Sequence, residues 1–347
     1  MHGVRLLVAV LMLTSGCRRS SGEPAPPPPA DGCSERDLAA CEGQCERGDP
    51  RACGVVVTSL TPGDPQRASD VLQRSCDAGH ATACNDLGVW RMAGKHGPRD
   101  LPAALELFQR GCAGELPAAC ANLGVLSLQG GDGVVPHLTR ALSALTVACE
   151  GGDPIGCANL GTMYGTGTGV SVDYPRAMQL FERGCVGGSG QACANLGQAH
   201  EKGAAGPADP GLAARYYDKG CAAGSPDACA YLGGLYAQGI GVAADRGRAI
   251  ELMARSCELG GLDACSDLGI ALILGDAGPA DPERGVQVLQ RACDAGGARA
   301  CLNLAAVFHD GVTGVPVDQG RAVELADRAC ALGEAKGCAA AQQLRGP

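Results

Sequence analysis

The sequence predicts an all-α fold, a solenoid in which a helix-turn-helix unit is repeated about eight times. Twenty of the 21 cysteines fall into ten pairs whose members are separated by seven residues. From Cys76 onward, the first cysteine of each pair recurs every 36 or 37 residues. A fixed period of this length is typical of repeat architectures. Each period also contains apolar residues at the spacing of a helix face, as at Ala177, Phe181 and Cys185.

The second helix of each unit is predicted to begin at an Asp that lies twelve residues before the next first cysteine. Asp accepts hydrogen bonds from the free amides at a helix N-terminus. The residues are Asp64, Asp100, Asp173, Asp209, Asp245, Asp281 and Asp318, and His137 is the one exception. A Gly three residues after the first cysteine is expected to end this helix in a left-handed conformation. These residues are Gly48, Gly79, Gly152, Gly188, Gly224, Gly260, Gly296 and Gly333.

The first helix of each unit is predicted to begin near the second cysteine and to run through a Leu-Gly pair. The pairs begin at Leu87, Leu123, Leu160, Leu196, Leu232 and Leu268. Because Gly has no side chain, this position allows a neighbouring helix to approach closely. A Gly-rich turn such as residues 165–169 then leads to the second helix.

The cysteine pairs are predicted to be disulfides. One cysteine closes a helix and the next opens an antiparallel helix, so a tight turn places them side by side. The pairs are Cys33–Cys41, Cys45–Cys53, Cys76–Cys84, Cys112–Cys120, Cys149–Cys157, Cys185–Cys193, Cys221–Cys229, Cys257–Cys265, Cys293–Cys301 and Cys330–Cys338. An even number at constant spacing indicates a disulfide framework formed in an oxidising compartment. An alternative is a metal site formed by the first four cysteines.

The N-terminal residues predict export. Residues 1–16 have a basic residue, a short apolar run and small residues before Cys17, as in a secretory signal peptide. Residues 13–17 resemble the lipobox of bacterial lipoproteins, which implies that Cys17 is acylated. Arg18 follows it, where lipoproteins retained at the inner membrane typically carry Asp, so the resemblance favours the outer membrane, facing the periplasm. The alternative is a secreted or periplasmic protein. Residues 17–32 are then a lipidated, Pro-rich linker, and residues 33–347 are the repeat domain.

The repeat from Cys149 reads CEGGDPIGCANLGTMYGTGTGVSVDYPRAMQLFERG. This pattern resembles Sel1-like repeats, which are relatives of tetratricopeptide repeats, and in particular the Hcp-type cysteine-rich secreted proteins. The resemblance covers about residues 45–347. It implies a right-handed α/α superhelix, and it also implies the C-x7-C disulfide in each repeat.

Motifs that carry chemistry are scarce in the sequence. No Ser lies three residues before any lysine, so the Ser-x-x-Lys nucleophile of serine β-lactamases is missing. The histidines have no ligand spacing, so no catalytic residue, metal or cofactor is predicted. A net charge of -9 argues against nucleic acid as a partner.

One recurring position suggests binding. The residue before each conserved Leu is Asp86, Asn122, Asn159, Asn195, Tyr231, Asp267 or Asn303. In tetratricopeptide domains, an Asn at the matching place holds a peptide backbone on the concave face. The resemblance therefore makes Asn122, Asn159, Asn195 and Asn303 the candidate peptide contacts. The alternative is that these side chains bond to the preceding loop. Tyr164 and Tyr236 are interpreted as core residues rather than ligand contacts.

These features favour a non-enzymatic envelope scaffold that binds a peptide or protein and is tethered to the membrane by lipid. The family resemblance leaves a second hypothesis, weak β-lactam binding or hydrolysis, which no residue pattern supports. A third hypothesis is a structural link between envelope components.

Overall fold

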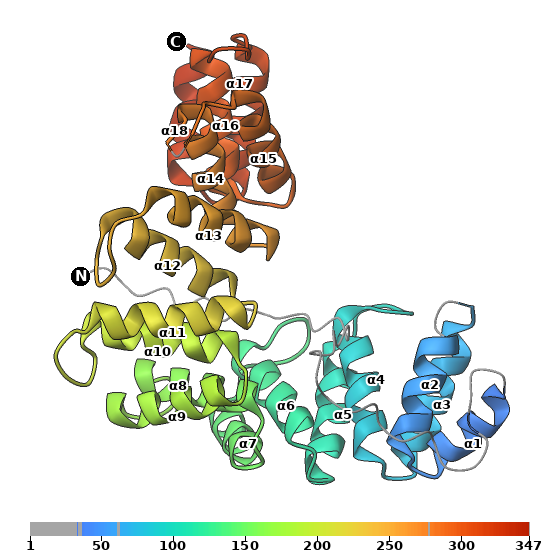
Figure 1. The fold of residues 1–347 in the computed structure, drawn as a ribbon. Helices are drawn as coiled ribbons and strands as arrows, with labels where there is room; N and C mark the ends of the chain where they lie inside the picture. Colours follow the sequence, from blue (N-terminus) through green and yellow to red (C-terminus); the bar gives the residue numbers. More distant parts are fainter. Residues whose placement is uncertain (1–32, 34–36, 61–62, 277, 347) are drawn as a thin grey trace. The chain divides into compact units, whose positions relative to one another are not determined.

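The computed structural model describes residues 33, 37–60, 63–276 and 278–346. The predicted signal peptide (residues 1–16), the linker (residues 17–32) and Cys17 lie outside these residues. The described residues form eighteen α-helices and no β-strand (Figure 1), which confirms the predicted all-α class. The chain divides into two compact units, Met1–Gly151 and Gly152–Pro347, and each is described by itself.

The first unit contains seven helices. They are α1 (Leu38–Glu46), α2 (Pro50–Leu60), α3 (Pro65–Asp77), α4 (Ala81–Ala93), α5 (Leu101–Ala113), α6 (Pro117–Gln129) and α7 (Leu138–Glu150). From α2 onward they alternate between the first and the second helix of a repeat. The pairs are therefore α2 with α3, α4 with α5, and α6 with α7.

The second unit contains eleven helices with the same alternation. They are α8 (Pro154–Thr166), α9 (Tyr174–Val186), α10 (Gly190–Lys202), α11 (Pro210–Ala222), α12 (Pro226–Gln238), α13 (Arg246–Glu258), α14 (Leu262–Leu274), α15 (Pro282–Asp294), α16 (Ala298–Asp310), α17 (Gln319–Ala331) and α18 (Ala335–Arg345). Helices α8 to α17 form five repeats, and α18 ends the array.

The predicted helix starts are confirmed. All seven Asp residues occupy the N-cap of a second helix, and each carboxylate accepts a hydrogen bond from the amide three residues later at 2.9–3.0 Å. The exception, His137, caps α7 in the same way, because its Nδ1 accepts from the Arg140 amide at 3.1 Å. The cap position therefore needs an acceptor, which imidazole supplies as well as carboxylate.

The predicted helix ends are also confirmed. The Gly residues that follow the first cysteines have φ between +85° and +95°. At Gly79 the amide donates to the Cys76 carbonyl at 2.9 Å, and the following His80 amide donates to Ser75 at 3.2 Å. This left-handed turn satisfies carbonyls that the helix leaves free. Glu115 takes the same place after α5 with φ of +59°, a conformation that costs a non-Gly residue more.

The Gly of each Leu-Gly pair lies where a second helix crosses closely. A Cβ at Gly161 would approach the Phe181 ring to 2.7 Å, and one at Gly124 would approach Leu145 to 2.5 Å. The bulky partner lies four residues before a first cysteine in both cases. The prediction that this Gly permits close helix contact is therefore confirmed.

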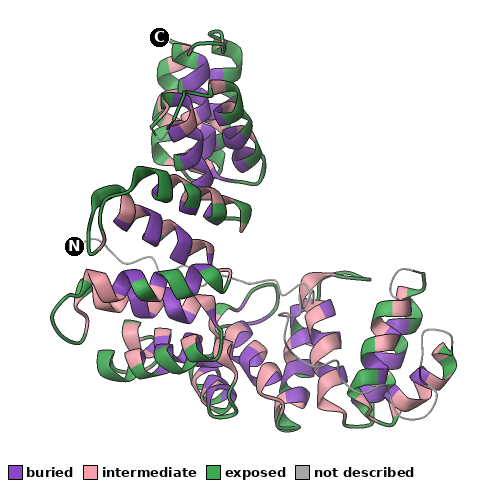
Figure 2. Ribbon diagram, in the orientation of Figure 1, coloured by how far each residue is buried: buried purple, intermediate pink, exposed green. Residues whose placement is uncertain are grey.

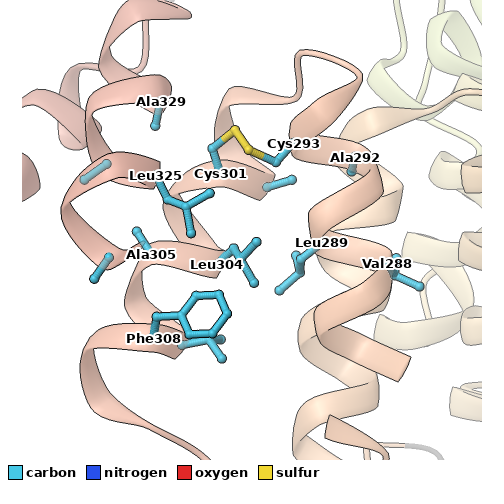
Figure 3. Packing of buried hydrophobic residues seen from close by; sticks show 14 of the residues in the cluster. Val288, Leu289, Ala292, Cys293, Cys301, Leu304, Ala305, Phe308, Leu325 and Ala329 are labelled. Atoms are coloured by element: carbon cyan, nitrogen blue, oxygen red, sulfur yellow. A yellow bond between two sulfur atoms is a disulfide. The ribbon is translucent and has the colours of Figure 1, made fainter. Parts of the chain in front are cut away.

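The cores are built mainly from small aliphatic side chains and cysteines. Buried residues form stripes along the faces at which neighbouring helices meet (Figure 2). In the cluster that extends to the C-terminal helices, Leu289, Leu304 and Phe308 pack beside the Cys293–Cys301 disulfide (Figure 3). Aromatic residues are only 3% of the chain, and cysteines recur among the buried residues.

Nine of the predicted cysteine pairs are disulfides with Cα–Cα distances of 4.5–4.7 Å. Cys149 and Cys157 are likewise disulfide-bonded. Disulfides between the first four cysteines overturn the alternative that these thiols form a metal site. Ten disulfides indicate an oxidising, extracytoplasmic location. Within the described residues, no helix has the length and apolar character required to cross a bilayer.

Candidate ligand-binding face

Most first helices of consecutive repeats lie against one another within each unit, although α12 and α14 make no comparable contact. Helix α4 contacts α6 in the first unit, and α8, α10 and α12 contact in succession in the second. From α4 onward, consecutive second helices are in no comparable contact. The first helices therefore line the more closely spaced side of the repeats, which we call the first-helix face. The position before the conserved Leu, which we call the ladder position, lies on this face.

The ladder Asn side chains join neighbouring first helices. The Asn122 amide donates to Oδ1 of Asn85 on α4 at 2.9 Å. Asn195 donates to the Thr162 hydroxyl on α8 at 3.3 Å, and Asn303 donates to the Ser266 hydroxyl on α14 at 2.8 Å. The bonds thus run to the preceding first helix, whereas the structural alternative raised from the sequence was a bond to the preceding loop.

Asn159 differs because it makes no bond to a neighbouring helix among the described residues. Its amide donates to the Ile155 carbonyl one turn earlier in α8 at 2.9 Å. The side-chain oxygens of Asn159, Asn122 and Asn303 accept no hydrogen bond from the part of the chain that the structure describes. Each oxygen can therefore still accept a hydrogen bond.

The other ladder positions carry different chemistry. Burial raises the pKa of the Asp86 carboxyl, and a hydrogen bond from Asn85 at 3.4 Å opposes this shift. Asp267 forms an ion pair with Arg299 of the next first helix. The Tyr231 hydroxyl accepts a long hydrogen bond from Gln198 at 3.5 Å, and its side chain is 42% exposed.

Several tyrosines outside the ladder are parts of the core, whereas Tyr174 is exposed. Tyr164 and Tyr236 are partly buried and pack against hydrophobic clusters, as predicted. Tyr217 is completely buried on α11, and its hydroxyl donates to the Glu201 carboxylate at 2.6 Å. Burial, together with this hydrogen bond and the charge of Glu201, raises the pKa of Tyr217, so the phenol stays protonated.

The face offers hydrogen-bond donors and acceptors. Among the described residues, no group of three or more His, Cys, Asp or Glu side chains could hold a metal ion. The predicted ladder residues Asn122, Asn159, Asn195 and Asn303 all lie on this face, within their respective units. Sequence reasoning missed their partners Asn85, Thr162 and Ser266. Asn85 and Ser266 lie two residues before the conserved Leu and Thr162 lies two residues after it, so no single column of the repeat contains all three.

Comparison with known proteins agrees with this architecture. The fold defines a helical-repeat protein whose repeats stack through their first helices. The Sel1 repeat model matches seven segments, and the chain belongs to the Sel1 repeat family, whose fold is a scaffold for protein interaction. The segments are residues 81–115, 117–153, 154–188, 190–225, 226–261, 262–297 and 298–334. Each begins at or next to the start of a first helix, whereas the sequence pattern was written from a cysteine. The family model thus matches seven repeats, where about eight units were predicted from the sequence.

Two solved structures support the same fold. A protective antigen of uropathogenic Escherichia coli that displays an SLR fold is 25% identical, with a TM-score of 0.60. That match covers 88% of this chain and only 66% of the antigen. A Sel1 repeat protein from Oxalobacter formigenes is 21% identical, with a TM-score of 0.59, and the match covers 93% of this chain and 98% of that one. No curated protein sequence matches the chain significantly.

Proposed function

We propose that the chain is a non-enzymatic scaffold of the cell envelope that binds an extended peptide segment on its first-helix face. The observation that carries the proposal is the pattern of ladder hydrogen bonds. The amides of Asn122 and Asn303 are held by the preceding helix, while their carbonyl oxygens remain unused by the described residues. Fixed acceptors are suited to the backbone amides of an extended peptide, and their orientation is already determined before binding.

The proposal places the scaffold at a membrane. Cys17 is the proposed site of acylation, residues 17–32 are the proposed linker, and the outer membrane is the proposed location. The disulfides support this proposal, because a lipoprotein with these cysteines would fold in an oxidising compartment. Incorporation of an alkyne-labelled fatty acid into the wild type, and none into Cys17→Ser, would support the anchor. Equal labelling of both would remove it.

The binding test compares two sets of substitutions with a tagged full-length chain. The ladder variant changes Asn122, Asn159 and Asn195 to Ala, which removes both the bonds to neighbouring helices and the free acceptors. The partner variant, Asn85→Ala with Thr162→Val, removes the bonding partners of Asn122 and Asn195 and leaves the ladder itself intact. Circular dichroism and thermal unfolding establish that both variants are folded.

Proteins captured from intact envelopes then distinguish the two roles of the ladder. If the ladder binds a peptide, the ladder variant loses the captured partner and the partner variant retains it. If the side chains only connect helices, both variants behave alike, and the proposal fails. Asn159→Ala alone is the mildest form of the test, because Asn159 bonds only within its own helix.

A further inference from the structure

Hydrogen bonds between side chains bridge most neighbouring first helices of the second unit, and they follow one rule. The later helix uses its ladder residue, and the earlier helix uses a polar residue one or five positions after its second cysteine. The pairs, with the earlier helix first, are Thr162 with Asn195, Gln198 with Tyr231, and Ser266 with Asn303. A hydrogen bond between Gln191 and Asp227 adds to the bridge between α10 and α12.

Helix α12 supplies no such bridge to α14, and we call this pair of helices the α12–α14 step. The two positions from which a bridge could start are Ala230 and Gly234, and neither has a polar side chain. The ladder residue of α14, Asp267, instead pairs with Arg299 on α16. Among the described residues, no hydrogen bond or ion pair joins side chains of α12 and α14, and these helices make no contact comparable to that between α10 and α12.

The buried core is divided at the same step. One cluster of buried residues extends from α10 to α13, where it includes Leu252. The next cluster begins at Cys265 on α14 and extends to Ala341 on α18, and Figure 3 shows part of it. Helix α13 lies between the two clusters, because Leu252 belongs to the first and the partly buried Met253 packs against the second.

The other side of the step, formed by α13, is firmly connected. The Cys257–Cys265 disulfide joins the end of α13 to the start of α14, with a Cα–Cα distance of 4.6 Å. The Ser256 hydroxyl on α13 donates to the Pro226 carbonyl oxygen at the start of α12 at 2.7 Å. Helix α13 also packs against both α12 and α14. The step is therefore held along α13, whereas its two first helices are not joined to each other.

A missing bridge does not by itself distinguish this step. Helix α16 has Leu302 and Ala306 at the two bridging positions, and no side-chain hydrogen bond joins it to α18 among the described residues. There, however, the two first helices are in contact, and one buried cluster covers α14 to α18. Within the described part of the second unit, the missing bridge and the divided core coincide at the α12–α14 step.

We propose that the α12–α14 step is a hinge of the second unit. Helices α8–α13 move as one body and α14–α18 as another, and the Cys257–Cys265 disulfide lies at the axis. Helices α12 and α14 separate and approach, while the contact of α13 with α14 is kept. Because the fewest contacts oppose movement at this step, domain motion is expected here. The motion changes the spacing of the first-helix face between Tyr231 and Asp267, and it does not depend on the proposed function of that face.

The test measures distances between two spin labels in the full-length chain by double electron–electron resonance. Because the native cysteines are disulfide-bonded, the nitroxides are attached to a genetically encoded keto amino acid. The labels replace exposed residues nine positions after a second cysteine, which are equivalent in each repeat. The hinge pair, Lys202 with Leu274, spans the α12–α14 step. The control pair, Thr166 with Gln238, spans the same number of repeats, and both of its steps are bridged.

The distance distribution of the hinge pair is expected to be at least about twice as broad as that of the control pair, because only the hinge pair joins two moving bodies. A bridge is then built with Ala230→Ser and Asp267→Asn, which copy the Ser266 and Asn303 pair of the α14–α16 step. This double variant should narrow the hinge-pair distribution to the width of the control. Asp267→Asn alone makes the same charge change without a partner hydroxyl and should leave the distribution broad.

Three results would overturn the inference. Equal widths for the hinge pair and the control pair in the wild type would show that the second unit is one body. A broad hinge pair with α14 amides that exchange much faster than those of α12 would indicate local unfolding instead of the movement of intact helices. A hinge pair that stays broad in the double variant would show that the missing bridge does not free the step. No ligand is present in these measurements, so their outcome is separate from the test of the proposed function.

Discussion

Arg110 on α5 reaches back to the end of α3, where its Nη2 lies 2.6 Å from the carbonyl oxygen of Cys76. The same atom lies 3.0 Å from Oδ1 of Asp77. Arg328 repeats the arrangement at the end of α15, with bonds to the carbonyl and carboxylate of Asp294. At these two places an arginine two residues before a first cysteine therefore binds the C-terminus of the preceding second helix. The cation compensates both the helix dipole and the carbonyls that the helix leaves free.

Arg110→Ala is expected to lower the free energy of unfolding by about 1 kcal/mol, because it removes a charge-assisted bond to a helix end. The exposed ion pair with Asp77 contributes only a minor part of this loss. The measurement is the urea midpoint of the full chain, supported by hydrogen exchange of the α3 amides.

Arg248→Ala is the matched control for this prediction. Arg248 pairs with Glu251 within α13, so its loss breaks no contact between repeats. Its expected effect is below about 0.5 kcal/mol. Equal effects of the two substitutions would mean that the bond to the Cys76 carbonyl contributes nothing measurable.

Glu115→Gly is expected to stabilise the chain by about 1 kcal/mol. Glu115 has φ of +59° at the place where the other repeats have Gly, and this conformation costs a residue with a Cβ about 1 kcal/mol. The gain should appear as a higher urea midpoint. The reverse change at an equivalent site, Gly188→Glu, should cost a similar amount. A destabilising Glu115→Gly would show that the Glu side chain makes a contribution that the backbone argument omits.

Gly161→Ala is expected to destabilise the second unit by about 1 to 3 kcal/mol, because overpacking displaces well-packed neighbours. A Cβ there would lie 2.7 Å from the Phe181 ring and 3.1 Å from the Ala177 carbonyl oxygen. Phe181→Leu in the same chain should restore part of the loss by making room. Gly234 in the middle of α12 is the control: a Cβ there would meet no heavy atom within 4 Å, so Gly234→Ala is expected to stabilise the helix.

The contrast between Gly161 and Gly234 shows how far the sequence predicts this protein. The repeat period, the Asp caps and the cysteine spacing are local signals that recur in almost every unit. A prediction made for one repeat can therefore be checked against the same signal in the others. Gly161 belongs to that pattern, and its close neighbour could be expected. Gly234 occurs once, and only the empty space around it in the folded chain distinguishes it from a residue required by packing.

The ladder position also shows which contacts the sequence alone does not predict. Its positions were predicted from the column of Asn residues, and they do lie on the first helices. Their hydrogen-bond partners could not be predicted, because Asn85, Thr162 and Ser266 are of three residue types and lie about one repeat away in sequence. Such contacts depend on how neighbouring helices are rotated, and that rotation is set by packing rather than by any local motif.

The disulfides are expected to stabilise individual repeats. In the chain-entropy model, closing a loop of this length contributes roughly 2.5 kcal/mol. Replacing Cys185 and Cys193 together by Ser should therefore lower the protection of α9 and α10 amides against hydrogen exchange more than that of α16 and α17, because repeats contact only their neighbours. Mass spectrometry of the unreduced wild type should find every disulfide between cysteines separated by seven residues. A uniform loss of protection along the chain would contradict local action of the staples.

Asp227→Asn is expected to stabilise the free protein at neutral pH. The folded-state pKa of Asp227 is raised above its ordinary value of 3.8 by burial and by the charge of Asp263. An acid whose pKa is raised on folding destabilises the folded state when it is ionised, and this cost is relieved as the pH falls through the folded pKa. The difference in urea midpoint between Asp227→Asn and the wild type should therefore be positive at pH 7. It should decrease as the pH falls and vanish below about 3.8, the ordinary pKa of an Asp carboxyl.

Urea midpoints measured against pH also separate the two causes that raise the pKa of Asp227, burial and the charge of Asp263. Burial is the larger cause, so most of the difference at pH 7 should persist in a chain that also carries Asp263→Asn, and the remainder measures the repulsion between the two carboxylates. A midpoint difference that is constant from pH 3 to 7 would mean that Asp227 acts through its hydrogen bond with Gln191, and that its charge is already balanced.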